Sequence, residues 1–102
     1  MSNVERGVPP VHAGIIFKEL IIDVLPHMTV ALAAKSLDVS RAYLDEIVKG
    51  QERITPELAT KIAKATGGSA EMWINMQVTY DLWEAAHNYS LTENVSELSL
   101  ST

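Results

Sequence analysis

The sequence has 102 residues, 47% of them hydrophobic and 21% charged, which fits one small globular domain with tails and excludes a fibrous or wholly disordered chain. The formal net charge is −5, and the absence of cysteine excludes disulfides, thiol catalysis and thiolate metal sites. We expect a soluble, cytoplasmic protein with no membrane partner, because no stretch is apolar enough for a membrane helix and the N-terminus lacks a signal-peptide pattern.

The charges are unevenly distributed along the chain. Six of the eight Lys and Arg residues lie between residues 27 and 67, whereas every charged residue from 68 to the end is acidic. The basic middle is compatible with a polyanionic partner despite the negative total. The acidic C-terminal third predicts either a surface for a basic partner or a solubilising charge, and the sequence leaves both open.

The first predicted helix covers residues 11–25, where apolar residues recur at helical spacing. Pro10 is able to open this helix in its first turn, and Pro26 ends it. Residues 1–9 contain Gly7 and are predicted to form a flexible arm.

Two short helices are predicted between residues 29 and 50. Thr29 is a good N-cap for the first, which stops at Asp38, a residue type that tolerates the left-handed conformation. Ser40 caps the second helix, which covers residues 41–49, and Gly50 is its expected C-cap.

Two further helices complete the prediction. Thr55 and the following Pro56 and Glu57 are typical of a helix start, and this helix ends at Gly67. Ser69 caps a fifth helix that reaches about residue 87. Residues 88–102 are polar and acidic, which predicts a flexible tail, so the fold class is an all-α domain of five helices over residues 10–87.

The segment 29–50 has the form of a helix-turn-helix motif. Its two short helices are joined by a turn of three residues, and the small side chains of Ala33 and Ala34 allow the second helix to cross the first closely. This crossing would hold residues 40–49 away from the body as a recognition helix for a DNA major groove. An alanine-rich helical hairpin is also compatible with plain core packing.

The chain resembles the phage-repressor-like (XRE/Cro-type) helix-turn-helix family and, within it, the HigA-type antitoxins of toxin-antitoxin modules. The resemblance covers about residues 10–87, and it lies in Pro-Val-His-Ala-Gly at 10–14, Leu-Asp-Val-Ser-Arg at 37–41, Arg-Ile-Thr-Pro-Glu at 53–57, Met-Trp-Ile-Asn-Met-Gln at 72–77 and Tyr-Asp-Leu-Trp at 80–83. The resemblance implies a five-helix lambda-repressor-like fold and a dimer that binds operator DNA. It further implies repression of its own operon and neutralisation of a partner toxin, usually an mRNA-cleaving ribonuclease.

Positions matching the family motif imply which residues contact DNA. The base-facing residues of the recognition helix are Arg41, Ala42, Tyr43 and Glu46. In chemical terms Arg41 can bond guanine O6 and N7, Ala42 can touch a thymine methyl group, and Glu46 can accept from cytosine N4. The residues expected at phosphates are Thr29, Ser40, Lys49, Gln51 and Arg53.

Several positions differ from the family pattern. Val30 and Leu32 replace a usual Gln and a usual acidic residue, Asp38 replaces a usual Gly, and Ala13 replaces a usual Pro. We interpret Asp45 as a surface charge rather than a base contact, because a carboxylate would repel the DNA backbone.

The fifth predicted helix carries an aromatic and methionine stripe at helical spacing, which is typical of a core or a dimer seam. The stripe consists of Trp73, Met76, Tyr80 and Trp83. We expect this helix to pack one face on the bundle and to share the remainder across a two-fold axis.

The sequence predicts neither a metal site nor an enzyme. His12, His27 and His87 have no spacing that places two on one helical face, so capping or surface roles are expected for them. There is no nucleophile elbow and no Gly-rich phosphate loop, so we expect no cofactor and no small-molecule substrate.

The leading hypothesis is therefore an autoregulatory antitoxin of a type II module, with double-stranded operator DNA, a basic protein toxin and a second copy of itself as partners. One alternative is a stand-alone phage-like repressor without a toxin. The other is a toxin-neutralising or scaffolding module that binds DNA weakly or not at all, which the acidic Asp45 and Glu46 and the replaced Val30 and Leu32 keep open.

Overall fold

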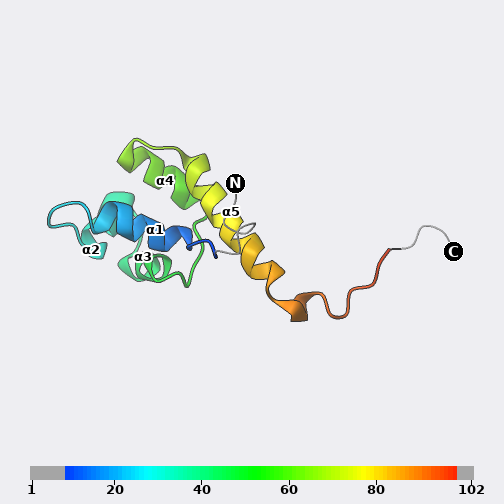
Figure 1. Cartoon of the computed structure of the whole chain (residues 1–102). Helices are drawn as coiled ribbons and strands as arrows, with labels where there is room; N and C mark the ends of the chain where they lie inside the picture. Colours follow the sequence, from blue (N-terminus) through cyan, green and yellow to red (C-terminus); the bar gives the residue numbers. More distant parts are fainter. Residues whose placement is uncertain (1–8, 99–102) are drawn as a thin grey trace.

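In a computed structural model, which describes residues 9–98, the chain is an all-helical bundle without a strand in that range (Figure 1). Its helices are α1 (Ala13–Phe17), the π-helix η1 (Lys18–Ile22), α2 (Val30–Leu37), α3 (Arg41–Val48), α4 (Pro56–Thr66), α5 (Ala70–Ala86) and the 3₁₀ turn η2 (Tyr89–Leu91). The predicted fold class is confirmed. Among the helices described, none is both long and apolar enough to cross a membrane.

The start of the first helix differs from the prediction. Helix α1 begins at Ala13, not at Val11, and Pro10 does not open it. His12 is the N-cap instead, because its ring Nδ1 accepts a hydrogen bond of 2.9 Å from the backbone N–H of Gly14. The imidazole thus replaces the hydroxyl or carboxylate more usual at this position.

The end of the first helix also differs from the prediction. After Phe17 the chain continues as η1, in which the backbone N–H of Asp23 donates to the carbonyl of Lys18 at 2.8 Å. The wider turn is closed by the side chains too, since Lys18 Nζ lies 3.0 Å from both carboxylate oxygens of Asp23. The helical segment therefore ends at Ile22, three residues before the predicted end at Leu25.

The caps of the remaining helices follow the sequence. The hydroxyl oxygens of Thr29, Ser40, Thr55 and Ser69 each accept a hydrogen bond from a backbone N–H in the first turn of the next helix. Asp38 ends α2 in the left-handed conformation, with φ 55°.

Helix α3 ends one residue earlier than expected. Lys49, not Gly50, is its C-cap, and Gly50 follows in the left-handed conformation with φ 76°. Gly67 ends α4 as predicted.

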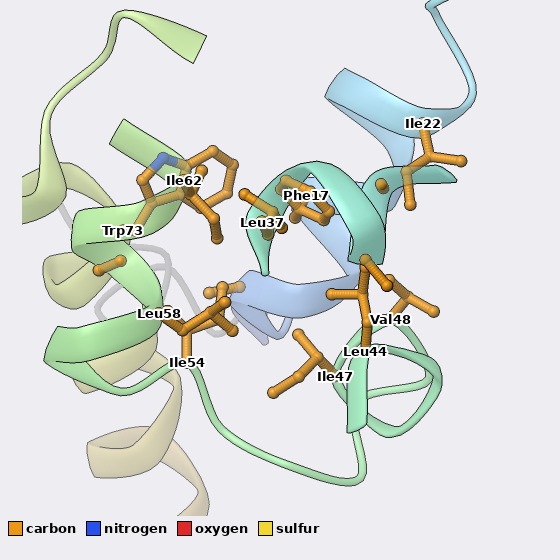
Figure 2. Packing of buried hydrophobic residues seen from close by; sticks show 14 residues of the cluster. Phe17, Ile22, Leu37, Leu44, Ile47, Val48, Ile54, Leu58, Ile62 and Trp73 are labelled. Carbon is orange, nitrogen blue, oxygen red and sulfur yellow. The ribbon is translucent and has the colours of Figure 1, made fainter. Parts of the chain in front are cut away.

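The core lies where helices α1 to α5 meet (Figure 2). Trp73 of α5 is 2% exposed, and its ring stands edge-on to Phe17 of α1 with centroids 5.8 Å apart. Leu44 and Ile47 of α3 and Ile62 of α4 are fully buried around them. Burial of one side chain of this size stabilises the folded state by about 1.5–3 kcal/mol, so the core fixes α3 to the bundle.

Helix α5 extends beyond the bundle. Its first half packs on α4 and α1, and its second half projects away from them toward the C-terminal segment (Figure 1). Beyond η2, residues 92–98 form no regular helix. The predicted arm, apart from Pro9, and the last four residues of the predicted tail lie outside the described residues.

Candidate nucleic-acid interface

Helices α2 and α3 form the helix-turn-helix. The turn between them is held from both sides: the backbone N–H of Val39 donates to Ala34 at 3.0 Å, and Lys61 Nζ of α4 donates to the carbonyl of Asp38 at 3.1 Å. Ala33 and Ala34 are buried where α2 meets the core. The small side chains allow the close crossing that the sequence predicted, so the direction of α3 is fixed by packing.

Helix α3 has one buried and one exposed face. Leu44, Ile47 and Val48 are buried against the bundle. Its N-terminal residues Arg41 and Ala42 are exposed. A helix supported from behind, with its first turn open to solvent, has the geometry of a recognition helix.

The four residues predicted to face bases do not share the same surroundings. The side chain of Arg41 is 70% exposed, and its Nε lies 3.8 Å from the carboxylate of Asp45 one turn later. Ala42 is exposed beside it, and Glu46 is half-buried. Tyr43 is half-buried against the core and lines a hollow together with Leu58 of α4. The structure therefore brings Arg41 and Ala42 onto the open side and turns Tyr43 toward α4.

The predicted phosphate contacts include two helix caps. The hydroxyl oxygens of Thr29 and Ser40 accept from the N–H groups of Leu32 and Tyr43, at 3.1 Å each. A hydroxyl that accepts in this way still has its own O–H to donate to a phosphate oxygen. Both residues are exposed, and so are Lys49 and Gln51 after α3.

Arg53, the fifth predicted phosphate contact, is paired with a residue of α5. Its Nε and Nη2 lie 3.1 and 2.6 Å from the same carboxylate oxygen of Asp81. The ion pair is partly open to solvent, with the side chains 52% and 37% exposed. Sequence reasoning missed Asp81, because the two residues are 28 positions apart and no local pattern connects them.

A buried glutamine supports this ion pair. Gln77 is 1% exposed; its Oε1 accepts from the backbone N–H of Ile54 at 2.8 Å, and its Nε2 donates to the other Asp81 oxygen at 3.0 Å. Helix α5 therefore holds two successive residues of the segment that follows the recognition helix. Gln77 was also missed, although a lone polar residue four positions after the core Trp73 is the signal that could have indicated it.

His12 closes the same cluster from the N-terminal side. Its ring is 4% exposed and packs edge-on against Tyr80, with centroids 5.1 Å apart. Burial lowers the pKa of His12 below its ordinary value of 6.5, although the nearby carboxylates of Asp81 and Glu84 oppose the shift. The neutral ring suits the cap, since Nδ1 must be unprotonated to accept from Gly14. Capping and surface roles were both expected for the histidines, and His12 has the capping one in a buried position.

Tyr80 connects the cluster to the next turn of α5. Its hydrogen bond with Glu84, together with burial, raises the pKa of the phenol above 10. The hydroxyl stays protonated at neutral pH and can donate to that carboxylate.

The aromatic stripe of α5 divides into two parts. Trp73 belongs to the core, and Met76 is half-buried against it. Trp83 lies on the projecting half of the helix, where His87 stacks on it with ring centroids 4.4 Å apart. Among residues 9–98, no three His, Cys, Asp or Glu side chains are grouped to hold a metal ion.

Comparison with known proteins defines the class. The helix-turn-helix family matches residues 25–73, which contain α2, α3 and α4. An uncharacterized helix-turn-helix-type transcriptional regulator from Haemophilus influenzae is 33% identical over 89 residues, which are 87% of this chain and 82% of the relative. The chain therefore belongs to the helix-turn-helix family of DNA-binding regulators.

Two further similarities define the branch of the family. The antitoxin HigA-1 of Vibrio cholerae is 30% identical over 80 residues, covering 78% of this chain and 74% of that protein. The structure of the Pseudomonas aeruginosa antitoxin HigA with the higBA promoter superposes with a TM-score of 0.71 at 27% identity, covering 88% of this chain and all but 1% of that one. The resemblance to HigA-type proteins is thus confirmed over nearly the whole fold.

Proposed function

We propose that the chain is an operator-binding antitoxin that inserts α3 into the major groove and represses its own operon. The observation that carries the proposal is the open first turn of α3, with Arg41 70% exposed on a helix whose other face is buried. The superposition on an antitoxin with its promoter supports it. The family match supports it as well, because its residues 25–73 include the whole helix-turn-helix.

Specific contacts follow from the exposed side chains. Arg41 is proposed to bond guanine O6 and N7, and Ala42 to contact a thymine methyl group. Thr29, Ser40, Lys49, Gln51 and Arg53 surround α3 and are proposed to hold the phosphates that fix its register. Glu46 is half-buried and could accept from cytosine N4 at the edge of this surface.

The proposal includes two protein partners. A second copy of the chain would pack along the outer side of α5, so that two recognition helices reach successive major grooves of a palindromic operator. A basic toxin, proposed to be an mRNA-cleaving ribonuclease, would bind the acidic C-terminal third, where no Lys or Arg follows residue 67.

The proposal is tested by binding to a fragment of the chain's own promoter at several stated salt concentrations. Arg41→Ala should weaken binding about tenfold or more and relax the preference for the promoter over unrelated DNA, because a bidentate base contact supplies about 1–3 kcal/mol of discrimination. Lys64→Ala is the matched control. It removes the same charge from the last turn of α4, and it should leave the preference unchanged.

A second candidate function is favoured by the carboxylate beside Arg41. Asp45 lies 3.8 Å from that guanidinium and offsets its charge, which suits a toxin-neutralising or scaffolding module with weak DNA binding. Absence of promoter binding at low salt would favour this function. The chain can also be co-expressed with a small basic protein encoded next to it. Relief of growth arrest in that experiment would favour the operator-binding antitoxin or the toxin-neutralising module over a stand-alone repressor.

A further inference from the structure

Asp81 of α5 contacts the predicted DNA-binding surface without being part of the helix-turn-helix. Its two carboxylate oxygens have different partners: one accepts from Gln77 Nε2 at 3.0 Å, and the other accepts from Nε and Nη2 of Arg53. The buried Gln77 is itself fixed, since its Oε1 is bonded to the backbone of Ile54. Gln77 therefore holds the Asp81 carboxylate in place independently of its ion pair with Arg53.

The ion pair occupies only one edge of the guanidinium. Arginine has five N–H donors, and Asp81 is bonded through Nε and Nη2. Within residues 9–98, Nη1 of Arg53 has no hydrogen-bond partner, and half of the side chain is exposed. A planar guanidinium bound along one edge cannot rotate freely, so its remaining donors keep a fixed direction toward solvent.

We propose that Asp81 is a positioning residue for DNA binding: from α5 it holds the Arg53 guanidinium ready for a backbone phosphate at the end of the recognition helix. The inference rests on the proposed function. It assigns α5 a part in DNA binding in addition to its part in the core. Because the arginine is ordered before DNA arrives, less side-chain entropy is lost when the phosphate binds.

A different role for Asp81 would have the opposite effect on affinity. If the carboxylate only competed with phosphate for Arg53, or only repelled the DNA backbone, its neutralisation would tighten binding. If it orients the arginine, neutralisation weakens binding even though one negative charge is lost. The sign of the change therefore separates the two roles.

The sharpest variant is Asp81→Asn. It keeps the size of the side chain and an oxygen for Gln77, and it removes the charge that binds Arg53. The pair is partly exposed, so little loss of fold stability is expected. Glu84→Gln is the matched control, because it makes the same charge change one turn further along α5 on the same hollow.

Binding to the chain's own promoter fragment should be measured for the full chain over a series of salt concentrations. Asp81→Asn should weaken binding about three- to tenfold at low salt, and Glu84→Gln should not weaken it. The slope of log affinity against log salt concentration reports how many phosphates the protein contacts. Arg53→Ala should reduce this slope by the equivalent of about one phosphate contact, and Asp81→Asn should also reduce it. A partly unfolded sample would lose active protein but keep the slope of the wild type.

The double variant gives an independent check. If Asp81 acts through Arg53, adding Asp81→Asn to Arg53→Ala should cause no further loss of affinity. Equal or tighter binding by Asp81→Asn, with promoter binding by the wild type intact, would overturn this inference alone. Absence of promoter binding by the wild type would overturn it together with the proposed function.

Discussion

Gly14 of α1 lies directly against the backbone carbonyl of Ile47 in α3. A Cβ atom built on residue 14 would overlap the carbonyl oxygen and also meet the Ile47 side chain. Both residues are buried, so neither helix can move outward without opening the core. The absence of a side chain at position 14 thus sets the distance between the first helix and the proposed recognition helix.

Gly14→Ala should therefore destabilise the fold by about 2–3 kcal/mol, the upper part of the range for overpacking a close contact, although Ala is the better helix former. The free energy of unfolding from urea titration measures this change. Gly68→Ala is the control, because a Cβ there would approach only Thr66 Oγ1, at 3.4 Å. Wild-type stability of Gly14→Ala would contradict the close approach.

Much of the fold was predictable because its signals are local. The hydroxyl caps at residues 29, 40, 55 and 69 and the stops at 38 and 67 follow from single residues and their next neighbours. The first helix was predicted least well. Its cap is an imidazole, and its second half widens into a π-helix, which apolar periodicity does not reveal.

The candidate site was less predictable than the fold. Exposure of Arg41 and Ala42 follows from the helical pattern, but Arg53 is paired with Asp81 and Gln77 is bonded to Ile54 across the fold. Such contacts depend on how α5 crosses the segment after α3. Spacing within one helix carries no information on that crossing.

The buried His12 predicts a pH dependence of stability. Its pKa is lowered in the folded chain, chiefly by burial, so around and below pH 6.5 the unfolded chain binds more protons than the folded one. The contribution of the neutral His12 ring to the free energy of unfolding is full above about pH 6.5. It is lost as the pH falls through the lowered pKa that His12 has in the folded chain. Asp81, Glu84 and Arg53 face the ring, and the two carboxylates limit the effect.

Urea titrations of the wild type and His12→Asn at pH 7.5, 6.5 and 5.5 check this prediction. Asn keeps an oxygen to cap α1 but does not titrate, so the variant should lose less stability than the wild type between pH 6.5 and 5.5. The same comparison with His27→Asn, in the exposed loop before α2, shows whether the effect belongs to the buried imidazole. Parallel profiles for wild type and His12→Asn would contradict it.

The carboxylate of Asp45 should limit DNA affinity. It is 3.8 Å from Arg41 Nε and close to the surface that would meet phosphates. Asp45→Asn removes both the repulsion and the competition for Arg41, so promoter binding at low salt should tighten about two- to fivefold. Glu71→Gln, in the first turn of α5, makes the same charge change as a control. Weaker binding by Asp45→Asn would show instead that this carboxylate orients Arg41.

The outer side of α5 should carry the proposed dimer contact. Met72 is 45% exposed and Leu82 is 66% exposed. At about 3.6 residues per turn, both point away from the side of α5 on which Trp73 enters the core. Exposed apolar residues on one side of a projecting helix are typical of a surface covered by another protein.

Leu82→Glu should therefore shift a dimer toward monomer in sedimentation at micromolar concentration, because a charge buried in an apolar contact without a partner is strongly unfavourable. The thermal midpoint of the monomeric fold should change little, since Leu82 contacts solvent rather than the core. Val24→Glu is the control, because Val24 is 67% exposed but lies on the segment before α2. This variant should leave the sedimentation coefficient unchanged. A wild type that sediments as a monomer would exclude the dimer, and a dimer unaffected by Leu82→Glu would move the contact to another surface.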